Sequence, residues 1–106
     1  MTRVKIEPGV CGMNTKVEAV ADDDGGVNVK IYSSCKGIQE MAKALGEEFD
    51  PYEICMTNSG RGPFYEYARS GGAIHAACPT ISGIIKCVEA ECGLALKKNV
   101  SIEFIN

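Results

Sequence analysis

The chain has 106 residues, of which 45% are hydrophobic and 24% are charged, and its net charge is −3. This is the composition of an ordinary globular protein, so we predict a single domain over residues 1–106. The 11 basic residues are dispersed along an acidic chain. Because a phosphate backbone is bound by clustered lysine and arginine, we exclude nucleic acid as a partner. No apolar run approaches the roughly 20 residues that cross a bilayer, so we also predict no membrane segment.

Whether the six cysteines form disulfides depends on the cellular compartment of the protein. The N-terminal sequence MTRVKIEPG alternates polar and apolar residues and lacks the apolar core of a secretory signal. We therefore expect a cytoplasmic protein, in which thiols stay reduced. On that basis the six cysteines are free thiols or metal ligands rather than three disulfides.

The first third of the chain has the pattern of three strands. Residues 2–7 alternate between apolar and charged side chains, as a half-buried strand does. Residues 15–20 and 27–32 alternate in the same way and flank the sequence Asp-Asp-Asp-Gly-Gly at 22–26. Aspartate and glycine tolerate the backbone angles of tight turns, so these two segments are predicted to form a β-hairpin.

The middle of the chain has the pattern of helices. Ser33-Ser34 precedes a segment whose apolar residues recur with helical spacing and which Gly46 ends: Ile38, Met41, Ala42 and Leu45. An Asp-Pro pair at 50–51 predicts a short helix over 51–56, and residues 63–69 can form another. Pro79 opens the longest helix, which Gly93 ends. Its predicted buried stripe is Ile81, Ile84, Ile85, Val88 and Cys92.

The last segment, residues 100–104, alternates Val100, Ile102 and Phe104 with Ser101 and Glu103 and is predicted to be a strand. The order is therefore three strands, a run of helices and a final strand. We predict an α+β two-layer sandwich, in which helices cover one face of a four-stranded, mainly antiparallel sheet.

Two cysteines are placed together by the hairpin. Its turn centres near Asp24, with Cys11 thirteen residues before that point and Cys35 eleven after it. Antiparallel pairing puts both just past the open end of the hairpin, at the same edge of the sheet.

Cys35 and Cys78 also lie at the starts of predicted helices. Free N–H groups at a helix N-terminus stabilise a thiolate, which is the form that binds metals and attacks electrophiles. Three residues before Cys78 is His75, the only histidine. With Cys11 and Cys35 these two residues would complete a Cys₃His set suited to zinc or an iron–sulfur cluster. A common type of crossover would bring Cys78 to the other two, but the sequence does not require it.

The leading hypothesis is therefore a small metal- or iron–sulfur-binding protein that uses Cys11, Cys35 and Cys78, with His75 as a candidate fourth ligand. The first alternative is a thiol enzyme or sulfur carrier with Cys78 as the nucleophile. The second is an interaction module with inert, buried cysteines, whose partner is another protein or a second copy.

Cys55, Cys87 and Cys92 are predicted to be structural, with Cys87 flanking the apolar stripe of the last helix. The Gly-Arg-Gly-Pro segment at 60–63 lacks a phosphate-loop pattern and is predicted to be an ordinary flexible loop.

Three segments resemble a family of short, functionally uncharacterised proteins associated with anaerobic bacteria and archaea. They are Gly9-Val10-Cys11-Gly12 with Thr15 close behind, Ser34-Cys35, and His75-Ala76-Ala77-Cys78-Pro79 leading to Glu89-Ala90 and Gly93-Leu94-Ala95-Leu96. The resemblance spans nearly the whole chain and implies a common fold. It points to the same three cysteines, and an anaerobic setting would favour an oxygen-sensitive cluster or a persulfide. Thr80 departs from the family pattern, in which an apolar residue follows the Cys-Pro pair.

Overall fold

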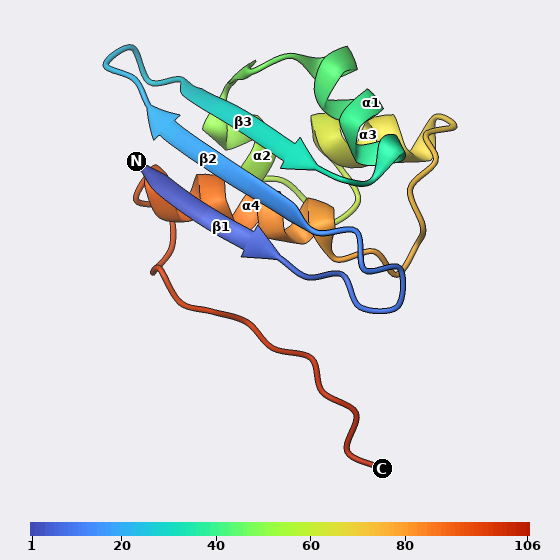
Figure 1. Cartoon of the computed structure of the whole chain (residues 1–106). Coiled ribbons are helices and arrows are strands. Elements are labelled where there is room, and N and C mark those ends of the chain that lie inside the picture. Colours follow the sequence, from blue (N-terminus) through green and yellow to red (C-terminus); the bar gives the residue numbers. More distant parts are fainter.

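One antiparallel sheet of four strands organises the chain (Figure 1). The computed structural model describes all residues from 1 to 106. The strands lie in the order of the sequence, β1-β2-β3-β4. They are β1 (Thr2–Ile6), β2 (Thr15–Ala21), β3 (Val27–Ser33) and β4 (Glu48–Phe49). The predicted four-stranded antiparallel sheet is thus confirmed.

The β2–β3 hairpin is held by its acidic turn. Ala21 pairs with Val27 at the turn end and Thr15 with Ser33 at the open end, so the hairpin is centred on residue 24, as predicted. Within the turn, the Asp22 carboxylate accepts hydrogen bonds from the backbone N–H groups of Asp24 and Gly26, at 2.8 and 2.9 Å. An aspartate that binds the backbone of its own turn fixes the register of the strands that follow.

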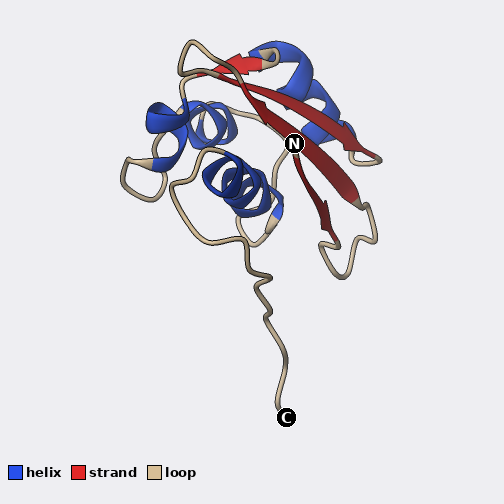
Figure 2. Cartoon of the chain, turned by 90° about the vertical axis from the view of Figure 1, so that its left-hand side faces the viewer, coloured by secondary structure: helices blue, strands red, loops and turns tan.

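The four helices are α1 (Lys36–Leu45), α2 (Pro51–Cys55), α3 (Pro63–Arg69) and α4 (Thr80–Glu91). Of these, α1 packs on β3 and α4 packs on β1 and β2, while α2 and α3 pack on the other helices (Figure 2). As the Asp-Pro pair predicted, Asp50 caps α2 by accepting a hydrogen bond from the backbone N–H of Tyr52 at 2.9 Å. No helix has both the length and the apolar character needed to cross a bilayer.

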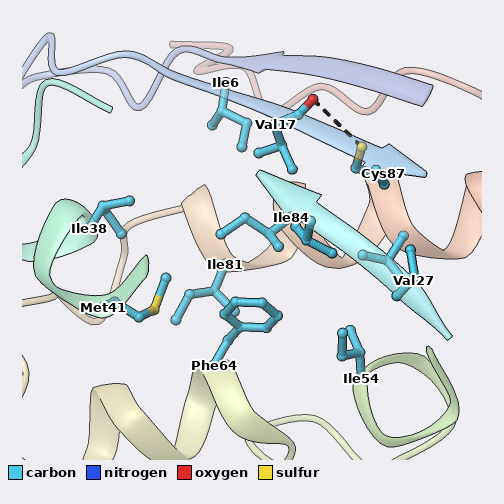
Figure 3. Close-up of a cluster of buried hydrophobic side chains, with 13 residues drawn as sticks. Ile6, Val17, Val27, Ile38, Met41, Ile54, Phe64, Ile81, Ile84 and Cys87 are labelled. Carbon is cyan, nitrogen blue, oxygen red and sulfur yellow. Dashed lines mark hydrogen bonds between the residues drawn. The ribbon is translucent and has the colours of Figure 1, made fainter. Parts of the chain in front are cut away.

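The core lies between one face of the sheet and the helices (Figure 3). Alternate strand residues point into it, and their neighbours along the strands point into solvent. Each helix contributes at least one buried side chain to the same cluster. The members labelled in Figure 3 are Ile6, Val17, Val27, Ile38, Met41, Ile54, Phe64, Ile81, Ile84 and Cys87. The predicted two-layer arrangement follows from this one-sided burial.

The predicted strand at residues 100–104 was wrong. Residues 95–106 form an extended, exposed tail that runs away from the body and pairs with no strand (Figure 1). Alternation favours a strand, but a strand forms only where a neighbour supplies hydrogen bonds. The fourth strand is instead β4, in which Phe49 pairs with Val27 and Glu48 with Asn28. Two residues are too few to show a periodic pattern.

The predicted buried stripe of α4 was also partly wrong. Ile81, Ile84 and Val88 are buried as expected, but Cys87 is fully buried whereas Ile85 and Cys92 are only half-buried. The helix is rotated because it packs on both β1 and β2. That rotation turns Cys87 toward the sheet, where its thiol donates a hydrogen bond to the Thr2 carbonyl oxygen at 3.3 Å.

Candidate functional site

The segments that carry Cys11 and Cys35 meet at the open end of the β2–β3 hairpin. β2 begins at Thr15 and β3 ends at the paired Ser33. One step further, the backbone N–H of Ser34 donates a hydrogen bond to the carbonyl oxygen of Asn14 at 3.2 Å. The β1–β2 loop with Cys11 and the start of α1 with Cys35 therefore lie at the same end of the sheet, as the hairpin arithmetic predicted.

Cys35 is held at the junction between β3 and α1. It is the N-cap residue of α1 and is half-buried. Its backbone N–H donates a hydrogen bond to Ser33 Oγ at 3.0 Å, and Ser33 Oγ lies 2.7 Å from Thr15 Oγ1. These two hydroxyl groups fix the backbone from which the Cys35 side chain extends. The thiol itself makes no capping hydrogen bond, so its sulfur is not committed to α1.

The segment before α4 reaches the same end of the molecule. A Cβ atom on Gly37, in the first turn of α1, would collide with the carbonyl oxygen of Ala73. A Cβ atom on Gly83, in the first turn of α4, would collide with the side chain of Ile6 at the end of β1. Ala73 therefore lies against the start of α1, and Gly83 lies against the end of β1. The crossover expected from the sequence does not form, because it would lead to the strand predicted at residues 100–104, and those residues pair with no strand.

Cys78 lies within that segment and is half-buried. Its thiol donates a hydrogen bond to Thr80 Oγ1 at 3.2 Å, and its backbone N–H donates one to the carbonyl oxygen of His75 at 3.1 Å. The second hydrogen bond closes a turn that holds Cys78 and His75 close together in space. His75 itself is exposed, and Thr80 is buried as the first residue of α4.

Cys11 is the most accessible of the three cysteines. It lies on the β1–β2 loop (residues 7–14), whose Gly9 and Gly12 have φ angles of 103° and 67°. These angles favour glycine, and the turn they form is closed by a hydrogen bond from the Gly12 N–H to the Gly9 carbonyl oxygen at 2.9 Å. The loop holds the Cys11 thiol in solvent beyond the end of the sheet.

The three thiols do not form one coordination sphere in this structure. No group of three or more histidine, cysteine, aspartate or glutamate side chains is close enough to hold a metal ion. All six cysteines are free thiols. The fold thus gathers the segments that carry Cys11, Cys35 and Cys78 at one end but leaves their sulfur atoms apart. The predicted ligand set stays a prediction.

A comparison with known protein families shows which family the chain belongs to. A family of unknown function, DUF6951, matches residues 2–104. The chain belongs to this family. No curated protein and no solved structure matches it. The resemblance drawn from the sequence is confirmed to the extent that the family is one without a known function, whereas the cysteine motifs and the anaerobic setting stay predictions.

The other three cysteines of this DUF6951 member, Cys55, Cys87 and Cys92, have raised thiol pKa values. Burial raises the pKa of the Cys87 thiol to about 11. Burial, and next the charge of Glu89, raise the pKa of Cys55 to about 11, and burial also raises the pKa of Cys92. A raised pKa keeps a thiol protonated and unreactive at neutral pH. Cys87 belongs to the hydrophobic core and Cys55 and Cys92 pack against it, in agreement with the structural role predicted for them.

No sequence pattern predicted the shallow groove of about 300 Å³ on the helical side. The groove is assembled from two parts of the chain: α2, the 57–62 loop and α3, which follow one another, and α4. Its polar lining includes Arg61, Tyr65, Ser82 and Lys86, with the Tyr65 hydroxyl 3.2 Å from Ser82 Oγ. Lys86 pairs with Glu89, another lining residue, at 3.8 Å. The charged lining consists of two cationic side chains, Arg61 and Lys86, and one carboxylate, Glu89, and it indicates no single class of ligand.

Proposed function

We propose that this protein binds a metal ion or an iron–sulfur cluster through Cys11, Cys35 and Cys78, with His75 as a candidate fourth ligand. The observation that supports the proposal is the convergence of three chain segments at one end of the sheet. The Ser34–Asn14 hydrogen bond joins two of them, and the close packing of Gly37 on Ala73 joins the third.

The chemistry of the donors supports zinc or an iron–sulfur cluster. Thiolate sulfur and imidazole nitrogen are the ligands that zinc takes in structural sites, and thiolates hold iron–sulfur clusters. Cys35 and Cys78 extend from ordered junctions at the starts of α1 and α4. Cys11 belongs to the exposed loop and must move inward for its sulfur to share one ion with theirs. The binding energy of a metal can offset the cost of such a local rearrangement.

The experiment is metal analysis of the chain purified without oxygen, followed by reconstitution with Zn²⁺ or with Fe²⁺ and sulfide. We expect about one ion or cluster per chain. Because loss of even an outer-shell partner lowers metal affinity about 10- to 100-fold, Cys11→Ser, Cys35→Ser and Cys78→Ser should each weaken binding at least tenfold. Cys92→Ser is the matched control and should bind as the parent chain does. The proposal would be contradicted if the chain takes up neither zinc nor an iron–sulfur cluster. It would also be contradicted if all three variants bind the metal as tightly as the control.

A second function is favoured by one contact, the 3.2 Å hydrogen bond between the Cys78 thiol and Thr80 Oγ1. If Cys78 ionises, the same hydroxyl can donate to the thiolate at the start of α4. Such a thiolate can accept sulfur from a persulfide. It attacks the outer sulfur, a new S–S bond forms, and the donor leaves as a thiolate.

Thiol chemistry and metal binding are distinguished by which cysteine variants lose sulfur addition and which lose metal binding. Incubation with a small-molecule persulfide, followed by mass spectrometry, should add one sulfur to Cys78 and none to the Cys78→Ser variant. Cys11→Ser and Cys35→Ser should leave that addition unchanged if Cys78 acts alone, whereas all three variants should fail in the metal experiment. Equal sulfur addition at all exposed thiols would exclude a special role for Cys78.

A further inference from the structure

The C-terminal tail (residues 95–106) has the side-chain pattern of a strand but no strand partner. The last backbone bonds before it run from the N–H groups of Leu94 and Ala95 to the Glu89 carbonyl oxygen and close α4. Beyond them, Ile102 and Phe104 are 88% and 97% exposed. Contiguous large apolar side chains in water mark a surface that contacts another molecule.

The first strand offers an open edge of matching length. β1 is the outermost strand of the sheet and pairs only with β2. Half of its peptide N–H and C=O groups therefore point outward without a strand partner. Neither proline nor a bulge interrupts its five residues. An edge of this kind is a template for one more strand.

The two faces of the tail match the two faces of the sheet at this edge. Val100, Ile102 and Phe104 form one side of residues 100–104, and Ser101 and Glu103 form the other. On β1, the side chains of Thr2, Val4 and Ile6 face the helices, and those of Arg3 and Lys5 face solvent. A paired tail would extend the apolar face with three apolar side chains.

On the solvent face, the same pairing would set the carboxylate of Glu103 beside the cationic side chains of Arg3 and Lys5. Lysine on an edge strand discourages indiscriminate pairing, because an apolar strand gains nothing from it. A strand that carries a carboxylate at the matching position is favoured instead. The charge pattern therefore selects the tail over an unrelated apolar strand.

We propose that residues 100–104 of one copy pair with β1 of a second copy, and that the exchange is reciprocal and forms a two-fold dimer. α4 runs antiparallel to β1, with Gly83 beside Ile6 and Glu91 hydrogen-bonded to Thr2 at 2.8 Å. The tail leaves the body past the end of α4 and leads away from its own edge strand (Figures 1 and 2). The five linking residues 95–99 can span about 17 Å, which is enough to reach a neighbouring chain. Reciprocal exchange fills both edges and closes the assembly.

The first test compares the full chain with a chain that ends at Asn99, by light scattering after size-exclusion chromatography. Both samples contain a thiol reductant and a chelator, so that disulfides and bridging metals are absent. We expect the full chain at twice its 11.3 kDa monomer mass and the shortened chain at the monomer mass. At low protein concentration, the thermal unfolding transition of the shortened chain, followed by circular dichroism, should match that of the full chain. A full chain that stays monomeric, including one whose tail binds its own β1, would overturn the proposal, as would a shortened chain that still dimerises.

The second test addresses the pairing itself. Ile102→Lys should raise the dimer dissociation constant at least tenfold, and Lys97→Ala, in the linker, should leave it unchanged. Glu103→Lys should also weaken the dimer, and the further changes Arg3→Glu and Lys5→Glu should restore it. Failure of this charge exchange to restore dimerisation would exclude pairing with β1. Neither test depends on metal, so failure of the dimer proposal can be distinguished from failure of the metal-binding proposal.

Discussion

The thiol of Cys87 donates a hydrogen bond to the carbonyl oxygen of Thr2 at 3.3 Å and joins the longest helix to the edge strand. The same sulfur lies 3.8 Å from the carbonyl oxygen of Val17 in β2, so one side chain contacts two strands. Cys87 has no exposed surface. Its role in the fold is to fill the space between α4 and the sheet while satisfying backbone acceptors.

Replacing Cys87 with alanine should therefore destabilise the protein. The substitution leaves a cavity and removes a hydrogen bond, and we expect it to lower the free energy of unfolding by about 1–3 kcal/mol. Cys92→Ala is the matched control, because Cys92 is half-buried and the expected loss is below about 1 kcal/mol. Urea denaturation followed by circular dichroism in the presence of reductant measures both. Equal losses for the two variants would contradict this role for Cys87.

Gly37→Ala should loosen the packing of residues 73–78 on α1. The new Cβ atom would collide with the Ala73 carbonyl oxygen, and overpacking of this kind costs about 1–3 kcal/mol. Lys36→Ala, at the exposed neighbouring position, should change the stability by less than about 0.5 kcal/mol. Thermal unfolding of both variants compares the two costs. If Gly37→Ala is as stable as Lys36→Ala, residues 73–78 are not held against α1 in the way described.

Local chemistry in the sequence explains most of the fold. The acidic turn centres the hairpin on Asp24, and that register alone brings the segments of Cys11 and Cys35 to one end. Ser33-Ser34 predicted the start of α1 to within a few residues, although the N-cap is Cys35 and no side chain caps the helix. Asp50 caps α2 as predicted. These features can be predicted from the sequence because the interacting groups lie within a few residues of one another.

Features that depend on distant contacts were missed or predicted incorrectly. The strand expected at residues 100–104 needs a neighbour, and periodicity does not reveal whether one is present. The burial of Cys87 depends on how α4 is rotated on β1 and β2, and the groove beside Lys86 forms only where α4 meets the segment from α2 to α3. The sequence could place Cys78 at a helix start, but the contact of Gly37 with Ala73, which brings the preceding segment to α1, depends on tertiary packing.

The reactivity of the six thiols should follow burial and pKa. Iodoacetamide at mildly alkaline pH should modify the exposed Cys11 first and the fully buried Cys87 last. Because the pKa of Cys55 is raised to about 11, its thiolate fraction should grow about tenfold per pH unit up to that value. Mass spectrometry of time points at several pH values gives the rate at each site. Early modification of Cys87 in the folded chain would contradict its placement in the core.

Glu91 should give the stability a dependence on acid pH. Its carboxylate accepts hydrogen bonds from the Ala21 N–H at 3.0 Å and the Thr2 hydroxyl at 2.8 Å, and it lies 3.6 Å from the N-terminal ammonium. The Ala21 N–H is the main cause that lowers the pKa of Glu91 below the ordinary value of 4.5, with the Thr2 hydroxyl and the ammonium charge adding to it. A carboxyl that binds protons more weakly when folded stabilises the fold above its unfolded pKa, and that contribution is lost as the pH falls through the folded value.

Glu91→Gln tests this assignment because it removes the charge and keeps the shape. At neutral pH we expect the variant to be less stable by about 1–2 kcal/mol, as for the loss of charged hydrogen bonds. The difference from the parent chain should shrink as the pH falls below 4.5, because protonation then removes the same charge from the parent. Glu66→Gln, which breaks only an exposed pair with Arg69, should cost less than about 0.5 kcal/mol. Urea unfolding from neutral to acid pH measures all three chains. A Glu91→Gln deficit that stays constant across that range would show that the loss of stability does not come from the titratable charge of Glu91.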